Sequence, residues 1–157
     1  MNVRVGQGFD VHQWSDDPGR DLVLGGVVLP GERGLAGNSD ADVVAHAAAD
    51  ALLGAAGLGD IGTHFPDTDP QWRGADSLTL LAHVVGLVRA EGWSIGNVDT
   101  TVITEAPKLA PHTAAMQERL TGAVGAAVTV KAKRAEGLGA LGRGEGVACF
   151  AVALLIR

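Results

Sequence analysis

The sequence has little of what several large classes of protein depend on. Cys149 is the only cysteine among 157 residues, so no disulfide can form within the chain. Aromatic residues make up 4% of the sequence and tyrosine is absent, which argues against a platform for stacking the bases of a single strand. The formal net charge is −6, and the only basic patch is the short segment 131–134. Nucleic acid, which needs a basic face, is therefore excluded as a partner, and a phosphorylated ligand would have to be held by local donors and metals.

Long hydrophobic runs are also missing. The apolar stretch Val147–Ile156 is well short of the roughly 20 residues that a membrane-spanning helix needs. The first residues, Met1 to Gly6, contain no apolar core of a signal peptide. Cys149 has no basic neighbour in the sequence, so we interpret it as a small buried side chain rather than a catalytic thiol. We expect a cytoplasmic protein with no membrane partner.

Glycine, in contrast, is abundant, with 23 of the 157 residues, about twice its usual share. It is densest between Glu136 and Gly146, where residues 137–142 match the pattern G-x-G-x-x-G. A dinucleotide-binding fold would need a helix after this turn and an acidic residue roughly 20 positions later, whereas here the chain passes directly into its last expected strand. We therefore expect a loop between two strands that carries Arg143 and two carboxylates, either as a ligand-binding loop or as a glycine hinge.

Hydrophobic patterns and turn signals divide the chain into a small set of elements. Strands are expected at 2–12, 98–104, 127–132 and 147–156, a short strand or hairpin arm at 21–29, and helices at 42–58, at 77–91 and from Pro111 to about Gly122. Ser39, followed three residues later by Asp42, is expected to cap the first helix. The order of elements predicts one domain over residues 1–157 with an α/β (α+β sandwich) fold, in which a mixed sheet of four to five strands has three helices packed on one face.

Three side chains could form a metal site. Asp10 and His12 are two positions apart on an expected strand, so their side chains leave the same face. His46, on the first expected helix, could supply a third ligand. One carboxylate and two imidazoles with a fourth position open is the composition of a catalytic zinc site. The alternative is a strand end with a surface aspartate and a partly exposed histidine.

Two aspartates could support this site. Asp42 and Asp50 lie four positions before and after His46 on the same helical face, so either could orient its imidazole. The remaining histidines have no such neighbours and are interpreted as surface or packing residues; they are His64, His83 and His112.

Two further segments could bind a ligand. The polar segment 59–77 contains Asp60, Asp67 and Asp69, whose carboxylates could accept hydrogen bonds from the hydroxyls of a polyol or a ribose. It could equally be a turn-rich connection. The prolines at both ends of the segment 107–111 fix the backbone there, which would present its polar groups rigidly to a base or would simply begin a helix.

Taken in order, these segments resemble the 2-C-methyl-D-erythritol 2,4-cyclodiphosphate synthase family over nearly the full length. The resemblance rests on the stretches 5–12 (VGQGFDVH), 39–46 (SDADVVAH), 51–56 (ALLGAA), 58–62 (LGDIG), 65–70 (FPDTDP), 106–108 (APK) and 142–146 (GRGEG). It implies an enzyme of non-mevalonate isoprenoid biosynthesis. The substrate's own 2-phosphate attacks the β-phosphate of its cytidine diphosphate ester, which closes a cyclic diphosphate and releases CMP.

The resemblance also implies a homotrimer of α/β subunits with active sites between neighbours. Asp10, His12 and His46 would hold zinc, and Glu136 would hold a second divalent ion, Mg²⁺ or Mn²⁺. An isoprenoid diphosphate could bind near the trimer axis, close to Arg143 and Glu145. The implied substrate-binding positions are Asp10, His12, Asn38, Ser39, Asp60, Gly62, Phe65, Pro66, Asp67, Thr68, Asp69, Thr104, Ala106, Pro107, Lys108, Leu109, Ala110, Lys133, Arg134, Ala135, Glu136, Ala140 and Arg143. Among these, Asp60 and Gly62 would meet substrate hydroxyls, 65–69 would cover the methylerythritol part, and 104–110 would bind cytosine from the adjacent subunit.

The sequence departs from the family's pattern at three positions. Asn38 and Arg134 stand where the family has a histidine and a threonine that stabilise the transition state, and Ala140 replaces a phenylalanine near the central cavity. Arg134 could replace the threonine hydroxyl, because a guanidinium can donate two hydrogen bonds to a phosphate, or it could point to solvent. We expect a metal-dependent phosphorus–oxygen lyase. Two alternatives stay open, a phosphohydrolase with water as nucleophile and a non-catalytic or impaired trimer that binds cytidine nucleotide or isoprenoid diphosphate.

Overall fold

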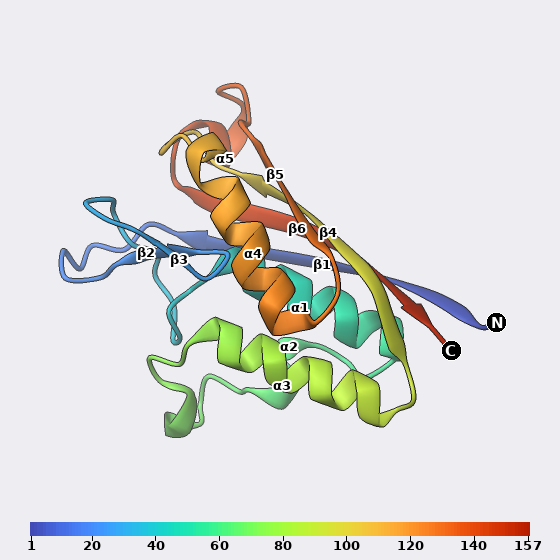
Figure 1. Cartoon of the computed structure of the whole chain (residues 1–157). Helices are drawn as coiled ribbons and strands as arrows, with labels where there is room; N and C mark the ends of the chain where they lie inside the picture. The colour runs from blue at the N-terminus through green and yellow to red at the C-terminus, as the bar shows by residue number, and fades with distance from the viewer.

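A four-stranded mixed sheet forms the framework of the protein, whose computed structural model describes residues 1–157 (Figure 1). Its strands are β1 (Val3–Gln13), β6 (Gly146–Ile156), β4 (Ser94–Ile103) and β5 (Val128–Lys133), in the order β1-β6-β4-β5. β6 is antiparallel to both of its neighbours, whereas β4 and β5 are parallel. A separate hairpin of β2 (Leu22–Leu24) and β3 (Val27–Leu29) turns at Gly25 and Gly26, both at positive φ. The predicted mixed sheet is confirmed.

Three long helices lie on one side of this sheet, as predicted. They are α1 (Val43–Ala56), α3 (Ser77–Ala90) and α4 (Thr113–Val124). α1 packs against β1 and β6, α4 packs against β5, and α3 packs against the other two helices. Single turns occupy the connections: α2 (Ile61–His64), η1 (Pro70–Trp72), η2 (Ala110–His112) and α5 (Gly139–Gly142). The polar segment 59–77 is therefore not a featureless loop, because α2 and η1 lie within it.

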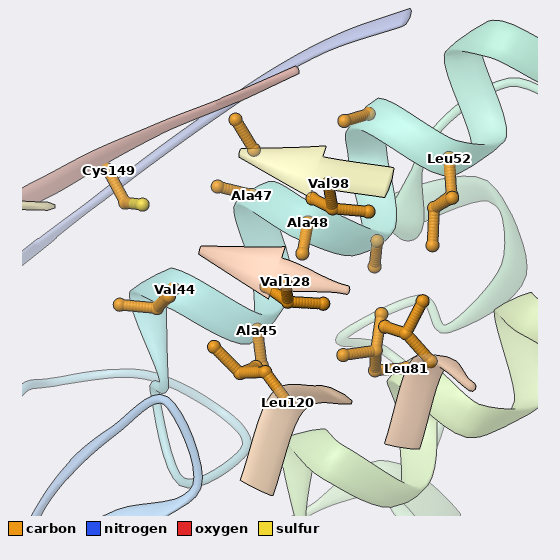
Figure 2. Close-up of a cluster of buried hydrophobic side chains, with 14 of the residues drawn as sticks. Val44, Ala45, Ala47, Ala48, Leu52, Leu81, Val98, Leu120, Val128 and Cys149 are labelled. Atoms are coloured by element: carbon orange, nitrogen blue, oxygen red, sulfur yellow. The ribbon is translucent and has the colours of Figure 1, made fainter. Parts of the chain in front are cut away.

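The core fills the space between the sheet and the helices (Figure 2). Figure 2 shows Leu52 of α1, Leu81 of α3 and Leu120 of α4 gathered with side chains from the strands. Cys149 of β6 is fully buried in this core, and burial raises the pKa of its thiol. The interpretation of Cys149 as a small buried side chain is confirmed. No helix of the structure combines the length and the apolar character that a membrane span requires.

The contact between β1 and α1 is unusually close because two glycines of β1 face the helix. A Cβ atom on Gly6 would lie 2.0 Å from the carbonyl oxygen of Ala51, and one on Gly8 would lie 1.9 Å from that of Ala47. Neither separation is possible between real atoms, so only glycine lets the helix backbone approach the strand this closely. The same approach sets the distance between the end of β1 and the first turn of α1.

Asp42, not Ser39, caps α1, so that expectation was wrong. Ala41 has a left-handed backbone (φ 58°), which turns the chain between Ser39 and the helix. The Asp42 carboxylate accepts hydrogen bonds from the backbone N–H groups of Val44 and Ala45. It also accepts from Gly25 and Gly26, so this one buried group ties the β2–β3 turn to the helix N-terminus. Burial raises the pKa of Asp42 to about 6.

The other face of the sheet is not covered by the chain. The large apolar side chains there are between 45% and 67% exposed; they are Val3, Val5, Phe9, Val11, Phe150 and Val152. Phe9 and Phe150 are cross-strand partners with ring centroids 4.9 Å apart. On the β4–β5 side of the same face, Asp99 pairs with Lys131 and accepts a hydrogen bond from Thr129. We call the apolar β1–β6 part of this surface the outer apolar patch. Exposed apolar patches of this kind mark interaction sites in soluble proteins.

Replacement of Gly8 by alanine should destabilise the protein by about 1–3 kcal/mol or more, because the added methyl group forces β1 away from α1. Gly54→Ala, on the α1 side of the same interface, is the matched control. Its Cβ would lie 3.8 Å from the carbonyl oxygen of Gln7, an ordinary contact, and alanine should stabilise the helix by about 0.5–1 kcal/mol. Denaturant unfolding of both variants measures the difference. Equal stability of Gly8→Ala and the parent protein would contradict this account of the interface.

Candidate metal centre

Three potential metal ligands converge at the end of β1 and the first turn of α1. Asp10 Oδ2 lies 2.9 Å from His12 Nε2 and 3.1 Å from His46 Nδ1, and the two imidazole nitrogens are 3.4 Å apart. The exposed fractions of these side chains are small: 24% for Asp10, 19% for His12 and 11% for His46. The structure thus brings together the three residues that the sequence indicated. All three also line a cleft at the surface of the protein.

The cluster fits zinc in both composition and spacing. Zinc binds imidazole nitrogen and carboxylate oxygen at about 2.0–2.2 Å, and tetrahedral geometry then places neighbouring ligand atoms about 3.3 Å apart. The three separations here, between 2.9 and 3.4 Å, are close to that value. One carboxylate and two imidazoles leave a fourth position for a ligand from the cleft, as in catalytic rather than structural zinc sites.

The second nitrogen of His12 is fixed by the backbone. His12 Nδ1 lies 2.7 Å from the carbonyl oxygen of Ala36, which can only accept, so Nδ1 carries the proton and donates it. The Nε2 lone pair of a neutral His12 then faces Asp10 and His46. A ligand histidine in a metalloprotein is usually held in this way by a hydrogen bond from its other nitrogen.

The second nitrogen of His46 has partners that the sequence did not indicate. His46 Nε2 lies 2.8 Å from the hydroxyl of Ser77, the first residue of α3, and 3.2 Å from that of Ser39. The proposed supports, Asp42 and Asp50, have other roles. Asp42 caps the helix, and Asp50 accepts a hydrogen bond from the backbone N–H of Ile61, at the start of α2. Spacing along α1 could not reveal Ser77, because it is 31 positions from His46 in the sequence.

The charges of the cluster stabilise one another. Burial alone would raise the pKa of Asp10, but the hydrogen bonds and positive charges of protonated His12 and His46 lower it below its usual value. Burial would likewise lower the pKa of His12, but the hydrogen bond to Asp10 and its charge raise it above 6.5. Burial raises the pKa of Asp50, which lies near Asp60 and Asp10. The metal-free cluster therefore holds an ionised Asp10 and a His12 that gains a proton more readily than usual.

The cleft beside the cluster has a volume of about 620 Å³ and contains many of the expected substrate positions. Those positions are Asp10, His12, Asn38, Ser39, Gly62, Phe65, Pro66, Asp67 and Thr68. Trp72 of η1 and Leu80 of α3 also line it, although the sequence did not single them out. Phe65 is buried, and its ring packs edge-on against Trp72 with centroids 4.9 Å apart, which gives this wall of the cleft an apolar surface.

A second, smaller pocket of about 150 Å³ lies at the other edge of the sheet, where β4 and β5 end. It is lined by the expected positions Thr104, Pro107, Lys108, Leu109, Ala110, Lys133 and Arg134. Ala106 lies beside it in an adjoining pocket. Lys108, Lys133 and Arg134 are all exposed and take part in no ion pair. This pocket therefore presents three free cations in a chain of net negative charge.

The remaining expected positions lie outside both pockets. Asp60 is exposed and caps α2, and hydrogen bonds from Thr63 lower its pKa. Asp69 caps η1, and the N–H of Ala135 donates to Glu105. Glu136, with φ 53°, and Ala140 are exposed in the glycine-rich loop. Arg143 Nε lies 2.6 Å from Glu145 Oε2. The metal cluster does not include Glu136.

The other three histidines lie outside the cluster, as interpreted from the sequence. His64 Nε2 lies 2.7 Å from the carbonyl oxygen of Leu58. His83 is exposed on α3, and its ring packs against Phe65 with centroids 5.5 Å apart. His112 is half-buried just before α4.

Comparison with known proteins gives full-length matches. Residues 3–156 match the profile of the YgbB family. The chain is 57% identical over 162 aligned positions to the 2-C-methyl-D-erythritol 2,4-cyclodiphosphate synthase of Bordetella petrii, covering 100% of this chain and 99% of the relative. It is 55% identical to that of Trichlorobacter lovleyi, covering 98% and 99%. A solved structure of 2C-methyl-D-erythritol-2,4-cyclodiphosphate synthase in a CDP-bound form is 38% identical, with a TM-score of 0.87 over 98% of this chain and 100% of that one.

Metal affinity should fall steeply in acid. A metal ion must displace the proton from His12, whose pKa is raised above 6.5, whereas Asp10 stays ionised because its pKa is lowered. The apparent affinity for Zn²⁺ should therefore drop by up to about tenfold per pH unit once the pH falls below the pKa of His12. Competition with a chromophoric chelator at several pH values from 8 to 5.5 measures this. The variant His112→Gln should show the same profile, and an affinity independent of pH would rule out His12 as a ligand.

Proposed function

The chain belongs to the YgbB family, and we propose that it has the activity for which its relatives are named. It converts 4-diphosphocytidyl-2-C-methyl-D-erythritol 2-phosphate to 2-C-methyl-D-erythritol 2,4-cyclodiphosphate and CMP, a step of isoprenoid precursor biosynthesis. Residues 1–157 act as a single synthase domain of a cytoplasmic enzyme. The observation that carries this proposal is the convergence of Asp10, His12 and His46 in a cleft that many of the expected substrate positions also line.

The nucleophile is the 2-phosphate of the substrate, which is already anionic, so the protein needs no general base for it. Catalysis then depends on alignment of the two phosphates and on stabilisation of their charge. Zinc at Asp10, His12 and His46 supplies positive charge to the β-phosphate when it is bound. The chain's own part is to orient the substrate, and Asn38 and Ser39 lie beside the cluster for this purpose. The apolar wall of Phe65 and Trp72 keeps water away from the methylerythritol part.

Further positive charge for the phosphates of the substrate comes from the smaller pocket at the ends of β4 and β5. Lys108, Lys133 and Arg134 are free of ion pairs, so they can donate to phosphate oxygens without first breaking a contact. Arg134 takes the transition-state role of the family's threonine, because its guanidinium can donate two hydrogen bonds. Glu136 follows in the same loop and, being exposed, is available to hold a second ion, Mg²⁺ or Mn²⁺.

The two pockets meet only between copies of the chain. His12 of β1 is the cross-strand partner of Val147 of β6. Ala148, the next residue of β6, pairs with Ile103 of β4, and Ile103 pairs with Lys133 of β5. These residues form one row across the sheet. The metal cluster and the cationic pocket therefore lie at the same end of the sheet but at opposite edges, three strand spacings or about 14 Å apart.

A closed ring of three copies joins these half-sites. If the outer apolar patch of each copy faces the axis, the β1 edge of one copy lies beside the β5 edge of the next, and every interface completes one active site. Burial of the patch would favour assembly, because Phe9 and Phe150 are exposed to water in the single chain. Its apolar surface could also bind an isoprenoid diphosphate at the axis. Arg143 and Glu145, which form an ion pair just before β6 begins, lie at the end of the sheet that carries the metal cluster.

Phosphorus NMR of the protein with the diphosphocytidyl substrate, Zn²⁺ and Mg²⁺ tests the reaction. We expect CMP and a cyclic diphosphate to appear together, and His46→Ala, which removes a zinc ligand, to reduce the rate at least 100-fold. His112→Gln serves as the control and should retain full activity. Unchanged substrate in the presence of bound zinc would favour the non-catalytic nucleotide-binding alternative. A linear product would favour the phosphohydrolase.

Phe9→Glu should prevent assembly, because it places a charge in the centre of the outer apolar patch without touching the core. Light scattering after gel filtration should give the mass of a trimer for the parent protein and of a monomer for the variant. Val28→Glu is the control, since the exposed fraction of Val28, 50%, is close to the 46% of Phe9 but Val28 belongs to the separate hairpin. A monomeric parent protein would contradict the shared active site.

A further inference from the structure

A chain of hydrogen bonds leads from the candidate metal centre through buried Ser77 to a half-buried carboxylate that has no role in the proposed reaction. His46 Nε2 lies 2.8 Å from Ser77 Oγ, and Ser77 Oγ in turn is hydrogen-bonded to Asp40 Oδ1. Ser77 is 1% exposed and His46 is 9% exposed. These residues come from three separate places: the turn before α1, the first turn of α1 and the first residue of α3.

The direction of each hydrogen bond is set by what the groups can donate. An ionised carboxylate can only accept, so the Ser77 hydroxyl donates its proton to Asp40. The oxygen of Ser77 is then left to accept from His46, and His46 Nε2 must carry a proton. A neutral imidazole has only one N–H, so the lone pair of His46 is on Nδ1, the nitrogen that faces Asp10 and His12.

Asp40 is itself held firmly in place. Its second oxygen, Oδ2, accepts from the backbone N–H of Ser77 at 3.1 Å, so the carboxylate grips both the backbone and the hydroxyl of this residue. Oδ1 also accepts from the backbone N–H of Asp42 at 3.1 Å. The left-handed turn at Ala41 lies between the two aspartates and lets Asp40 face α3 while Asp42 faces the β2–β3 turn.

We propose that Asp40 and Ser77 are positioning residues of the metal centre: Asp40 orients the Ser77 hydroxyl, and Ser77 fixes the tautomer and ring orientation of His46 for metal binding through Nδ1. This inference rests on the metal site of the proposed function and adds two residues to it. Without Ser77 the proton of His46 can move to Nδ1, where it blocks the metal. Ser39 compensates only in part, because its hydroxyl is farther away, at 3.2 Å, and accepts from the N–H of Ala41.

The experiment is a titration of the metal-stripped protein with Co²⁺ and Zn²⁺, read by the visible absorption of bound Co²⁺ and by chelator competition. Loss of a hydrogen bond to a ligand histidine typically weakens metal affinity 10- to 100-fold. We expect losses in this range for Ser77→Ala, a larger loss for Ser39→Ala combined with Ser77→Ala, and recovery of most of the affinity in Ser77→Thr, which keeps the hydroxyl. Thr79→Ala, an exposed position on the same turn of α3, should stay within twofold of the parent protein.

Asp40→Asn is the second, nearly isosteric test. The amide can no longer accept from both the hydroxyl and the N–H of Ser77, so the hydroxyl is free to turn and donate to His46, which favours the wrong tautomer. Affinity should again fall, with a changed Co²⁺ spectrum, while thermal unfolding in the presence of a chelator shows that the variant is folded. Parent-like metal affinity in folded Ser77→Ala and Asp40→Asn would overturn the proposal.

The metal titration is independent of the cyclase assay. Weaker binding by the two variants supports the positioning role even if the parent protein does not convert the diphosphocytidyl substrate. A parent protein that binds neither Co²⁺ nor Zn²⁺ would overturn the metal centre and this inference together.

Discussion

The close approach of α1 to β1 sets the geometry of the metal cluster and of the cleft beside it. Gly6 and Gly8 remove the side chains that would otherwise separate the strand from the carbonyl groups of Ala51 and Ala47. The helix contributes mainly alanine and small aliphatic residues to the buried interface, so the backbones can lie close together. His46 is one position before Ala47 in the first turn of α1. The glycine contact therefore also sets the separation of His46 from Asp10 and His12, which protrude from the end of the same strand.

Four aspartates surround this contact, and each has a different task because each has different partners. Asp10 faces the two imidazoles, and when these are protonated their hydrogen bonds and charges keep it ionised. Asp42 is fully buried among four backbone N–H groups and joins the helix N-terminus to the β2–β3 turn. Asp50 holds the start of α2, beside the cleft. Asp40 faces Ser77 and acts on the metal centre only through that hydroxyl. Residue type alone does not distinguish these roles, since position and partners decide them.

The separation of the two pockets explains how an acidic chain can handle a substrate with several phosphates. One carboxylate and two imidazoles that could bind a cation lie together at the β1 edge, and the free cations Lys108, Lys133 and Arg134 lie at the β5 edge. Because the ligand cluster and the three cations lie at opposite edges of the sheet within one chain, they do not pair with each other. A phosphorylated substrate bound between copies would bridge them, and the outer apolar patch gives the copies a reason to associate. In the proposed trimer, assembly and catalysis depend on the same sheet.

Patterns along the chain were enough to predict the main elements and the ligand triad. Alternating and helical periodicities indicated the four long strands and three long helices to within a few residues at most ends, and the Asp-x-His spacing put two ligands on one face because side chains on a strand alternate. The support of the triad became visible only in the folded chain. Ser77 is 31 positions from His46 and 37 from Asp40, and no local spacing reports a contact between segments so far apart. The helix cap was also not predictable from local spacing, because the left-handed turn at Ala41 makes Asp42 rather than Ser39 the capping residue. Local patterns record the geometry of one element, whereas hydrogen bonds between elements depend on how closely their backbones can pack.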